Sequence, residues 1–219
     1  IAYNTPPNTP QWTRAKVFKF QTTDIAELNT TTYVVEYPII NTANQIITCC
    51  SVNTTTNHTV QIKVAQGTYP FSPLSSPEKT EVEDYVKQWI PAGISYTIIS
   101  TDSDKIEIVA DIYYDGQYTS VISANVIAAL ENYFSNLPFD GTVSNQAIID
   151  AMQAVQGVNY VRLSKVLCRK DIQSYGTGVT LYDLSTGTDA VKYLTYAGYI
   201  EEETTSGHTF TDTLNFIVS

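Results

Sequence analysis

The sequence is poor in the residues on which catalysis and charge-driven binding depend. Charged residues make up 16% of its 219 positions, and there are only two histidines and one methionine. About 25% of the residues are charged in typical soluble domains. A nucleophilic triad usually needs a histidine base, and no serine here stands in a G-x-S-x-G context. We therefore predict no catalytic residue and no enzyme activity.

The three cysteines, Cys49, Cys50 and Cys168, are an odd and sparse set that does not predict a disulfide framework. The sequence has no C-x-x-C, and His58 and His208 lie in threonine-rich, turn-like stretches. We therefore expect inert, partly buried thiols and neither a metal site nor a cofactor. Such thiols fit a protein that folds in a reducing cytoplasm.

The net charge of −10 comes from 12 basic and 22 acidic residues. Binding to phosphates needs a surplus of basic residues, so we expect no nucleic acid as a partner. An anionic membrane surface would repel the chain, and no apolar run approaches the roughly 20 residues that span a bilayer. No secretory signal is visible, and because the sequence opens at Ile1 without Met we expect an upstream portion.

Polar but uncharged residues and tyrosine take the place of charge, and 16 residues are tyrosine. An uncharged surface is cheap to desolvate, which suits a chain covered by neighbours. Tyrosine is frequent at interfaces and also in ordinary strands. We predict that Tyr193, Tyr196 and Tyr199 form an interface. A glycan-binding module with exposed Tyr or Trp is the alternative.

The hydrophobic pattern predicts an α+β fold with small antiparallel sheets, each covered by helices on one face. Thr9 should cap a short helix that starts at Pro10, and Ser76 with Pro77 should open another. The second half reads β-β-α-α-β: strands at 94–100 and 106–114, helices at 120–136 and after Ser144, and a strand at 158–167. The expected segments are a leader and short helix (1–23), a first α+β domain (24–92), a second (93–169) and a β-meander or C-terminal arm (170–219).

Two acidic clusters suggest further chemistry. Asp102 and Asp104 form a D-x-D, which a metal-dependent nucleotidyltransferase would use to hold metal ions, although the usual preceding Gly-Ser is missing. A polar hairpin turn is the simpler interpretation. Residues 201–203 are three glutamates, which we interpret as a solvated strand edge that resists unwanted pairing, with cation binding as the alternative.

Several segments in order resemble a known family. Residues 90–94 (IPAGI) run into the strand at 95–100, the strand at 106–114 ends in Tyr-Tyr before Asp115, and residues 133–141 (YFSNLPFDG) lead through Ser144 to 155–158 (VQGV). Their order over residues 76–168 is similar to that of baseplate J-like wedge proteins of tailed phages. Residues 18–21, 62–65 and 196–199 also resemble the members from phages and prophages of Bacteroides-type bacteria.

The resemblance implies a structural wedge subunit of a tail baseplate. Such a subunit links the central hub to neighbouring wedges and to peripheral fibre proteins. The partners implied are copies of itself or a related wedge protein around a six-fold ring, together with hub and tail-fibre proteins. The implied location is the virion tail, after assembly in the host cytoplasm. The family has no active site to transfer to this chain.

Overall fold

The computed structural model describes residues 6–57 and 59–219, so residues 1–5, in the predicted leader, and His58 lie outside the described residues. The fold is α+β, as predicted. The chain divides into two compact units, 1–102 and 103–219, instead of the four segments expected. None of the helices in the described ranges has the length and apolar character that a membrane span requires.

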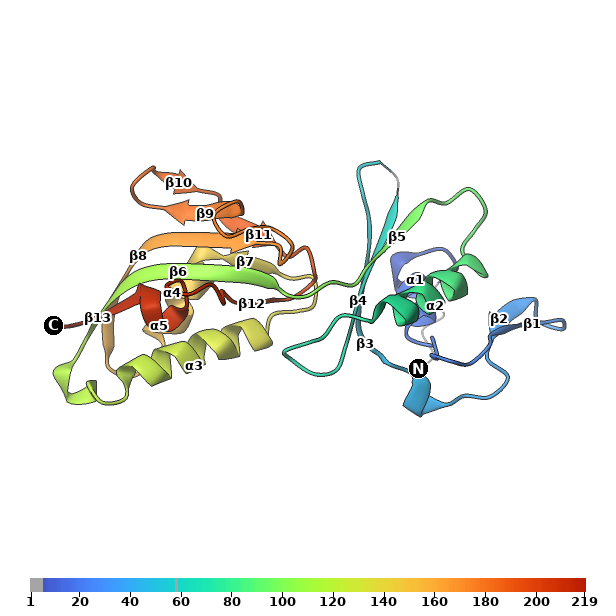
Figure 1. Cartoon of the computed structure of the whole chain (residues 1–219), viewed down its shortest axis with the longest axis horizontal. Helices are drawn as coiled ribbons and strands as arrows, with labels where there is room; N and C mark the ends of the chain where they lie inside the picture. The colour runs from blue at the N-terminus through green and yellow to red at the C-terminus, as the bar shows by residue number, and fades with distance from the viewer. Residues whose placement is uncertain (1–5, 58) are drawn as a thin grey trace. The chain divides into compact units, whose positions relative to one another are not determined.

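The first unit is built on a three-stranded sheet in the order β3-β4-β5 (Figure 1). Strands β3 and β4 are antiparallel, whereas β4 and β5 are parallel and are connected through helix α2. Strands β1 and β2 form a separate two-stranded hairpin. The elements are α1 (Pro10–Val17), β1 (Glu27–Asn29), β2 (Val34–Glu36), the 3-10 turn η1 (Thr42–Asn44), β3 (Ile47–Thr54), β4 (Val60–Gln66), α2 (Ser76–Lys87) and β5 (Tyr96–Ile99).

Local sequence signals explain both helices of this unit. Thr9 caps α1 and accepts a hydrogen bond from the Trp12 amide at 3.2 Å, with Pro10 at the first helical position, as predicted. Helix α2 begins one residue earlier than predicted, because Ser75 is the cap and forms a capping box with Glu78. The helices share one core with the sheet through Val17, Phe20, Cys50, Ile62, Val82, Tyr85, Val86 and Ile98.

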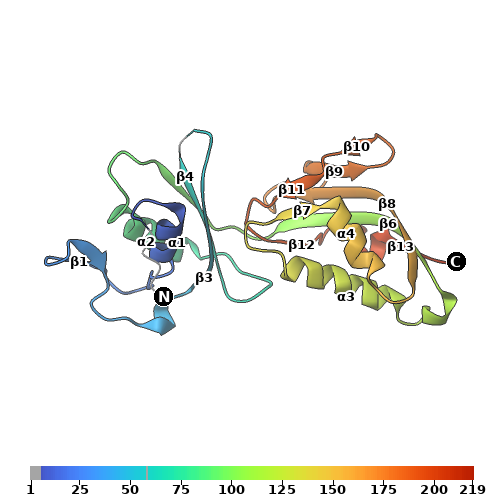
Figure 2. The ribbon, with the colours of Figure 1, turned by 180° about the vertical axis from the view of Figure 1, so that it is seen from behind.

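The second unit is built on a six-stranded sheet in the order β10-β9-β8-β6-β12, with β13 following β12 along the same edge of β6 (Figures 1 and 2). Helices α3, α4 and α5 lie on one face, and β7 pairs with β11 beside them. The elements are β6 (Asp104–Tyr114), the 3-10 turn η2 (Gly116–Tyr118), α3 (Ile122–Ser135), β7 (Thr142–Ser144), α4 (Asn145–Gln153), β8 (Val158–Arg169), β9 (Val179–Asp183), β10 (Thr188–Asp189), β11 (Lys192–Leu194), β12 (Ile200–Glu202), α5 (Phe210–Thr213) and β13 (Leu214–Val218).

The two faces of this sheet differ in chemistry because side chains alternate along each strand. Ile106, Ile108 and Ile112 of β6 are fully buried under the helices. Lys105 and Glu107 lie on the opposite face, called here the polar face. Ser144 caps α4, and Gly157, which follows that helix, has φ +95°, a left-handed conformation that is typical of glycine after a helix end.

Three features of the topology differ from the sequence-based expectation. The strand predicted at 94–100 forms at Tyr96–Ile99, but it pairs with β4 in the first unit and not with β6. Residues 170–219 do not extend as an arm, since their strands β9, β10, β12 and β13 complete the sheet of the second unit. Parallel pairing of β12 and β13 with β6 also makes that sheet mixed and not purely antiparallel.

Candidate functional site

Two of the three tyrosines predicted at an interface are buried within the second unit, so that prediction is corrected. Tyr193 is 8% exposed and Tyr199 is 4% exposed. The Tyr193 hydroxyl donates to Asp104 Oδ2 at 2.8 Å, and the Tyr199 ring stacks on Phe139 at 6.3 Å between centroids. Burial, followed by the Asp104 charge, raises the Tyr193 pKa. Only Tyr196 stays half-buried, with Lys170 Nζ 3.9 Å from its ring centroid.

The Asp102–Asp104 pair does not form a metal site. Asp104 is fully buried, and its carboxylate accepts hydrogen bonds from the Tyr193 hydroxyl and from the amides of Tyr196 and Ala197. Asp102 is exposed and ends the first unit, and the segment is a connection between two sheets, not the hairpin turn expected. Within residues 6–57 and 59–219, no group of three or more His, Cys, Asp or Glu is placed to hold a metal ion.

The three glutamates at 201–203 each have partners within the protein, which corrects their interpretation as a solvated edge. Glu201 accepts from Lys105 Nζ at 3.0 Å, and Glu202 accepts from the Phe210 amide. Glu203 is 2% exposed and pairs with Arg169 through bonds of 2.6 and 2.7 Å. These carboxylates hold the C-terminal segment against the sheet.

A second polar cluster on the same face surrounds Glu107. Its carboxylate contacts Lys165 Nζ at 3.0 Å, the Tyr175 hydroxyl at 2.9 Å and His208 Nδ1 at 2.7 Å. Burial alone would raise the Glu107 pKa, but these three partners together lower it. The rings of Tyr175 and His208 stack at 3.8 Å. The carboxylate therefore holds the segments that carry Tyr175 and His208 against the sheet.

The three thiols have no redox partner among themselves and are poorly placed to react. Cys50 and Cys168 are buried, and Cys49 is half-buried. Burial raises the pKa of Cys50 to about 12 and raises the pKa of Cys49 and Cys168 as well. Since the thiolate is the reactive form, these residues are structural.

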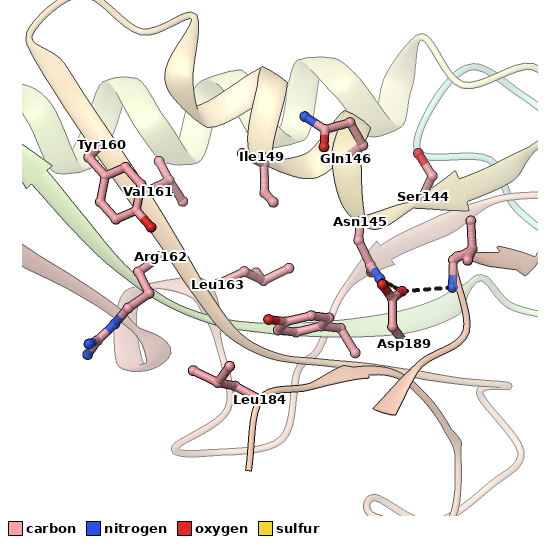
Figure 3. A pocket seen from close by; sticks show the side chains of 12 residues that line it. Ser144, Asn145, Gln146, Ile149, Tyr160, Val161, Arg162, Leu163, Leu184 and Asp189 are labelled. Carbon is pink, nitrogen blue, oxygen red and sulfur yellow. Dashed lines mark hydrogen bonds between the residues drawn. The ribbon is translucent and has the colours of Figure 1, made fainter. Parts of the chain in front are cut away.

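One surface hollow is a groove of about 620 Å³ in the second unit (Figure 3). Helix α4, strands β8 and β9 and the turn at 189–191 enclose it. Ligand sites of small molecules fall in the range of about 300–1,000 Å³. Its apolar lining consists of Ile149, Val161, Leu163, Leu184 and Val191, with the rings of Tyr160 and Tyr182 beside them.

Two polar side chains lie close together in this groove. Asn145, the first residue of α4, is 8% exposed and donates from Nδ2 to Asp189 Oδ1 at 3.0 Å (Figure 3). The Val191 amide donates to the same Asp189 oxygen at 3.1 Å. No local sequence pattern predicts this pair, because Asn145 follows a cap residue and Asp189 ends strand β10, 44 residues away. We name the hollow the Asn145 groove.

Comparisons with known proteins add no relative. A scan against the models of known protein families finds no match, and a search of curated proteins finds none either.

Proposed function

We propose that this protein is a structural wedge subunit of a phage or phage-like tail baseplate. On this proposal it contacts copies of itself or a related wedge protein around a six-fold ring, as well as hub and tail-fibre proteins. The resemblance of the segments at 76–168 to baseplate J-like proteins motivates the proposal. In this role the protein needs no active site and acts through its contacts with neighbouring subunits.

The observation that carries the proposal is a stretch of the first unit that is rich in exposed apolar side chains, called here the 25–40 patch. Its members are Ile25, Leu28, Tyr33, Val34, Ile39 and Ile40, between 38% and 79% exposed. Single exposed apolar residues are ordinary, but groups of them mark surfaces that another protein covers. Six within 16 residues favour a chain with a permanent neighbour.

The hairpin within the patch supports the same conclusion. Among the strands of the described residues, β1 and β2 pair only with each other, over three residue pairs. An isolated two-stranded hairpin is marginally stable in water. A neighbouring subunit that covers Leu28, Tyr33 and Val34 would supply the burial that the hairpin lacks.

Function would then be mechanical. The ring is held in one arrangement by subunit contacts until receptor binding favours another. Contact with a receptor shifts such an equilibrium only if it binds the two states with different affinity. The small number of charges allows large contact surfaces to be desolvated at modest cost.

Cryo-electron microscopy of particles from the producing cell tests the proposal. We expect density for this chain in a ring at the tail tip, with the 25–40 patch covered by a neighbour. Ile39→Lys with Ile40→Lys should abolish incorporation, whereas the exposed substitutions Gln11→Lys and Thr80→Lys should not. A chain that is monomeric and absent from every particle would overturn the proposal.

A glycan-binding module is the second candidate, and Tyr160 favours it. This residue is 55% exposed and borders the Asn145 groove, where its ring could stack on a sugar. A panel of methyl glycosides, screened by ligand-observed NMR, separates the two candidates. Saturable sugar binding by a chain that no particle contains would favour the module. The nucleotidyltransferase reading loses support because Asp104 is buried and hydrogen-bonded.

A further inference from the structure

One buried polar atom in the Asn145 groove has no hydrogen-bond partner within residues 6–57 and 59–219. Asn145 Nδ2 is used by Asp189 Oδ1 and by the Leu181 carbonyl, whereas Asn145 Oδ1 is buried and receives no hydrogen bond from the described residues. Leaving such an acceptor unsatisfied costs about 1–3 kcal/mol, so buried polar atoms are nearly always paired. The oxygen can therefore accept a hydrogen bond from a donor that the described residues do not supply, which is either solvent or a ligand.

The second acceptor in the groove is charged. The Asp189 carboxylate accepts the two bonds from Asn145 and Val191 on Oδ1, and a carboxylate has about four lone-pair positions. Asp189 is exposed, so it can receive an incoming group. Both groups offer acceptors to a ligand, and one carries a negative charge, which favours a cationic donor.

The apolar walls of the groove favour a ligand with an aliphatic stem. Ile149, Leu163 and Leu184 line it around the two acceptors. A ligand that matches this lining has an aliphatic stem and a donor-rich, positively charged end. Arginine has this form, with a stem that packs on apolar surface and a planar fork of five N–H donors.

We propose that the Asn145 groove receives an arginine side chain from a neighbouring protein subunit, an inference that rests on the proposed baseplate function. The guanidinium donates to Asn145 Oδ1 and to the Asp189 carboxylate together. Lysine fits less well, because its ammonium is a point charge and not a fork that can reach acceptors on two side chains. Arginine is also enriched in protein interfaces and among their energetic hot spots.

The source of the arginine is a second protein and not the same unit. Arg162 is ion-paired with Asp111, and Arg169 is ion-paired with Glu203. The net charge of −10 favours the approach of a cationic segment. The volume of about 620 Å³ accommodates the arginine together with the residues that flank it.

The test is a titration of the whole chain with N-acetyl-L-arginine amide, followed by two-dimensional NMR of backbone and side-chain amides. We expect saturable shifts at the Asn145 side-chain amide and at the Val191 N–H, with a Kd in the millimolar range, roughly what a single side chain supplies. N-acetyl-L-citrulline amide has the same shape without the charge. It should bind at least about tenfold more weakly.

A pair of variants tests whether arginine binds in the Asn145 groove. Asp189→Asn keeps an oxygen acceptor for Asn145 and Val191 but removes the charge, and it should weaken arginine binding about tenfold. Asp171→Asn removes the same charge at another exposed position and should change nothing. Because Asp189 is exposed, its variant should fold, which its amide spectrum checks directly.

Three results would overturn the inference. Equal binding of the citrulline probe would mean that the groove does not recognise the guanidinium charge. Binding of methyl glycosides in place of arginine would assign the groove to sugars. The absence of saturable shifts with every probe up to about 100 mM would mean that solvent satisfies Asn145. The baseplate proposal is judged separately: failure of arginine binding in a chain found in the ring overturns only this site, whereas binding by a chain absent from particles overturns only the baseplate role.

Discussion

Replacing Glu203 by glutamine tests how the C-terminal residues are held on the polar face of the second unit. The side chains of Glu203 and Arg169 are 2% and 9% exposed, and two hydrogen bonds of 2.6 and 2.7 Å join them. Arg169 Nη1 also donates to the carbonyls of Asp171 and Gln173 at 2.9 and 2.7 Å. Glu203→Gln keeps the size of the side chain but leaves a buried guanidinium without its counter-charge.

Two lines of reasoning give a similar value for the stability that Glu203→Gln removes. Breaking a buried pair by removing one partner costs about 3–5 kcal/mol. Separately, burial raises the Glu203 pKa, but the bonds from Arg169 and Thr205 outweigh it and lower the pKa from 4.5 to about 2. At about 1.4 kcal/mol for each pH unit, that difference corresponds to about 3 kcal/mol of stability at neutral pH.

The sign of the pH dependence follows from the lowered pKa. The contribution of Glu203 is present in full above pH 4.5 and is lost as the pH falls towards about 2. The difference in stability between the wild-type protein and Glu203→Gln should therefore fall to less than about half its neutral value by about pH 3.

Hydrogen exchange measured by mass spectrometry is the suitable assay, because Trp12 and Trp89 both lie in the first unit and their fluorescence reports on that unit. Glu203→Gln should lower the protection of β8 and β12 by about 3 kcal/mol, with β3 and β4 unchanged. Glu131→Gln, at an exposed position on α3, is the matched control. A loss below about 1 kcal/mol, or the same loss in both units, would refute the reasoning.

Three further changes probe the interior of the second unit. Tyr193→Phe removes a donor to the buried Asp104 carboxylate and should lower the free energy of unfolding by about 1–3 kcal/mol in urea titration. Gly157→Ala should cost at least about 1 kcal/mol in the same assay, because Gly157 has φ +95° and a Cβ there would lie 2.4 Å from the Tyr118 ring. The Cys168 thiol, fully buried and with a raised pKa, should react with a thiol reagent only after unfolding, as absorbance assays of released chromophore would show.

Local signals in the sequence predicted local structure well. The cap at Thr9 formed as expected, the helix expected after Ser144 is α4, and the strand expected at 106–114 lies within β6. Each of these features depends on residues within a few positions of one another, so the local sequence is enough to predict it. The α+β class followed from the same signals.

Pairing between distant segments was not predictable in the same way. Strand β5 joins β4, and β13 joins β6 with Leu214 opposite Ala110, 104 residues away. The hydrophobic pattern of a strand shows that one face is buried, but it does not show which strand lies beside it. The pattern therefore predicts only a β-meander or an arm for the C-terminal strands, and not their pairing with β6 and β8.

The same limit explains why the predicted interface residues were misplaced. Tyrosine has an apolar ring and a hydroxyl that needs a partner, so it suits both a protein interface and a core that contains a buried acceptor. In this chain the acceptor is Asp104, 89 residues before Tyr193, and only the fold brings the two together. The same fold places Asn145 beside Asp189 but leaves Asn145 Oδ1 without a donor. A composition rich in tyrosine therefore points to contact surfaces in general, whereas an unpaired buried acceptor points to one particular place on the molecule and to the chemistry of the group that would fill it.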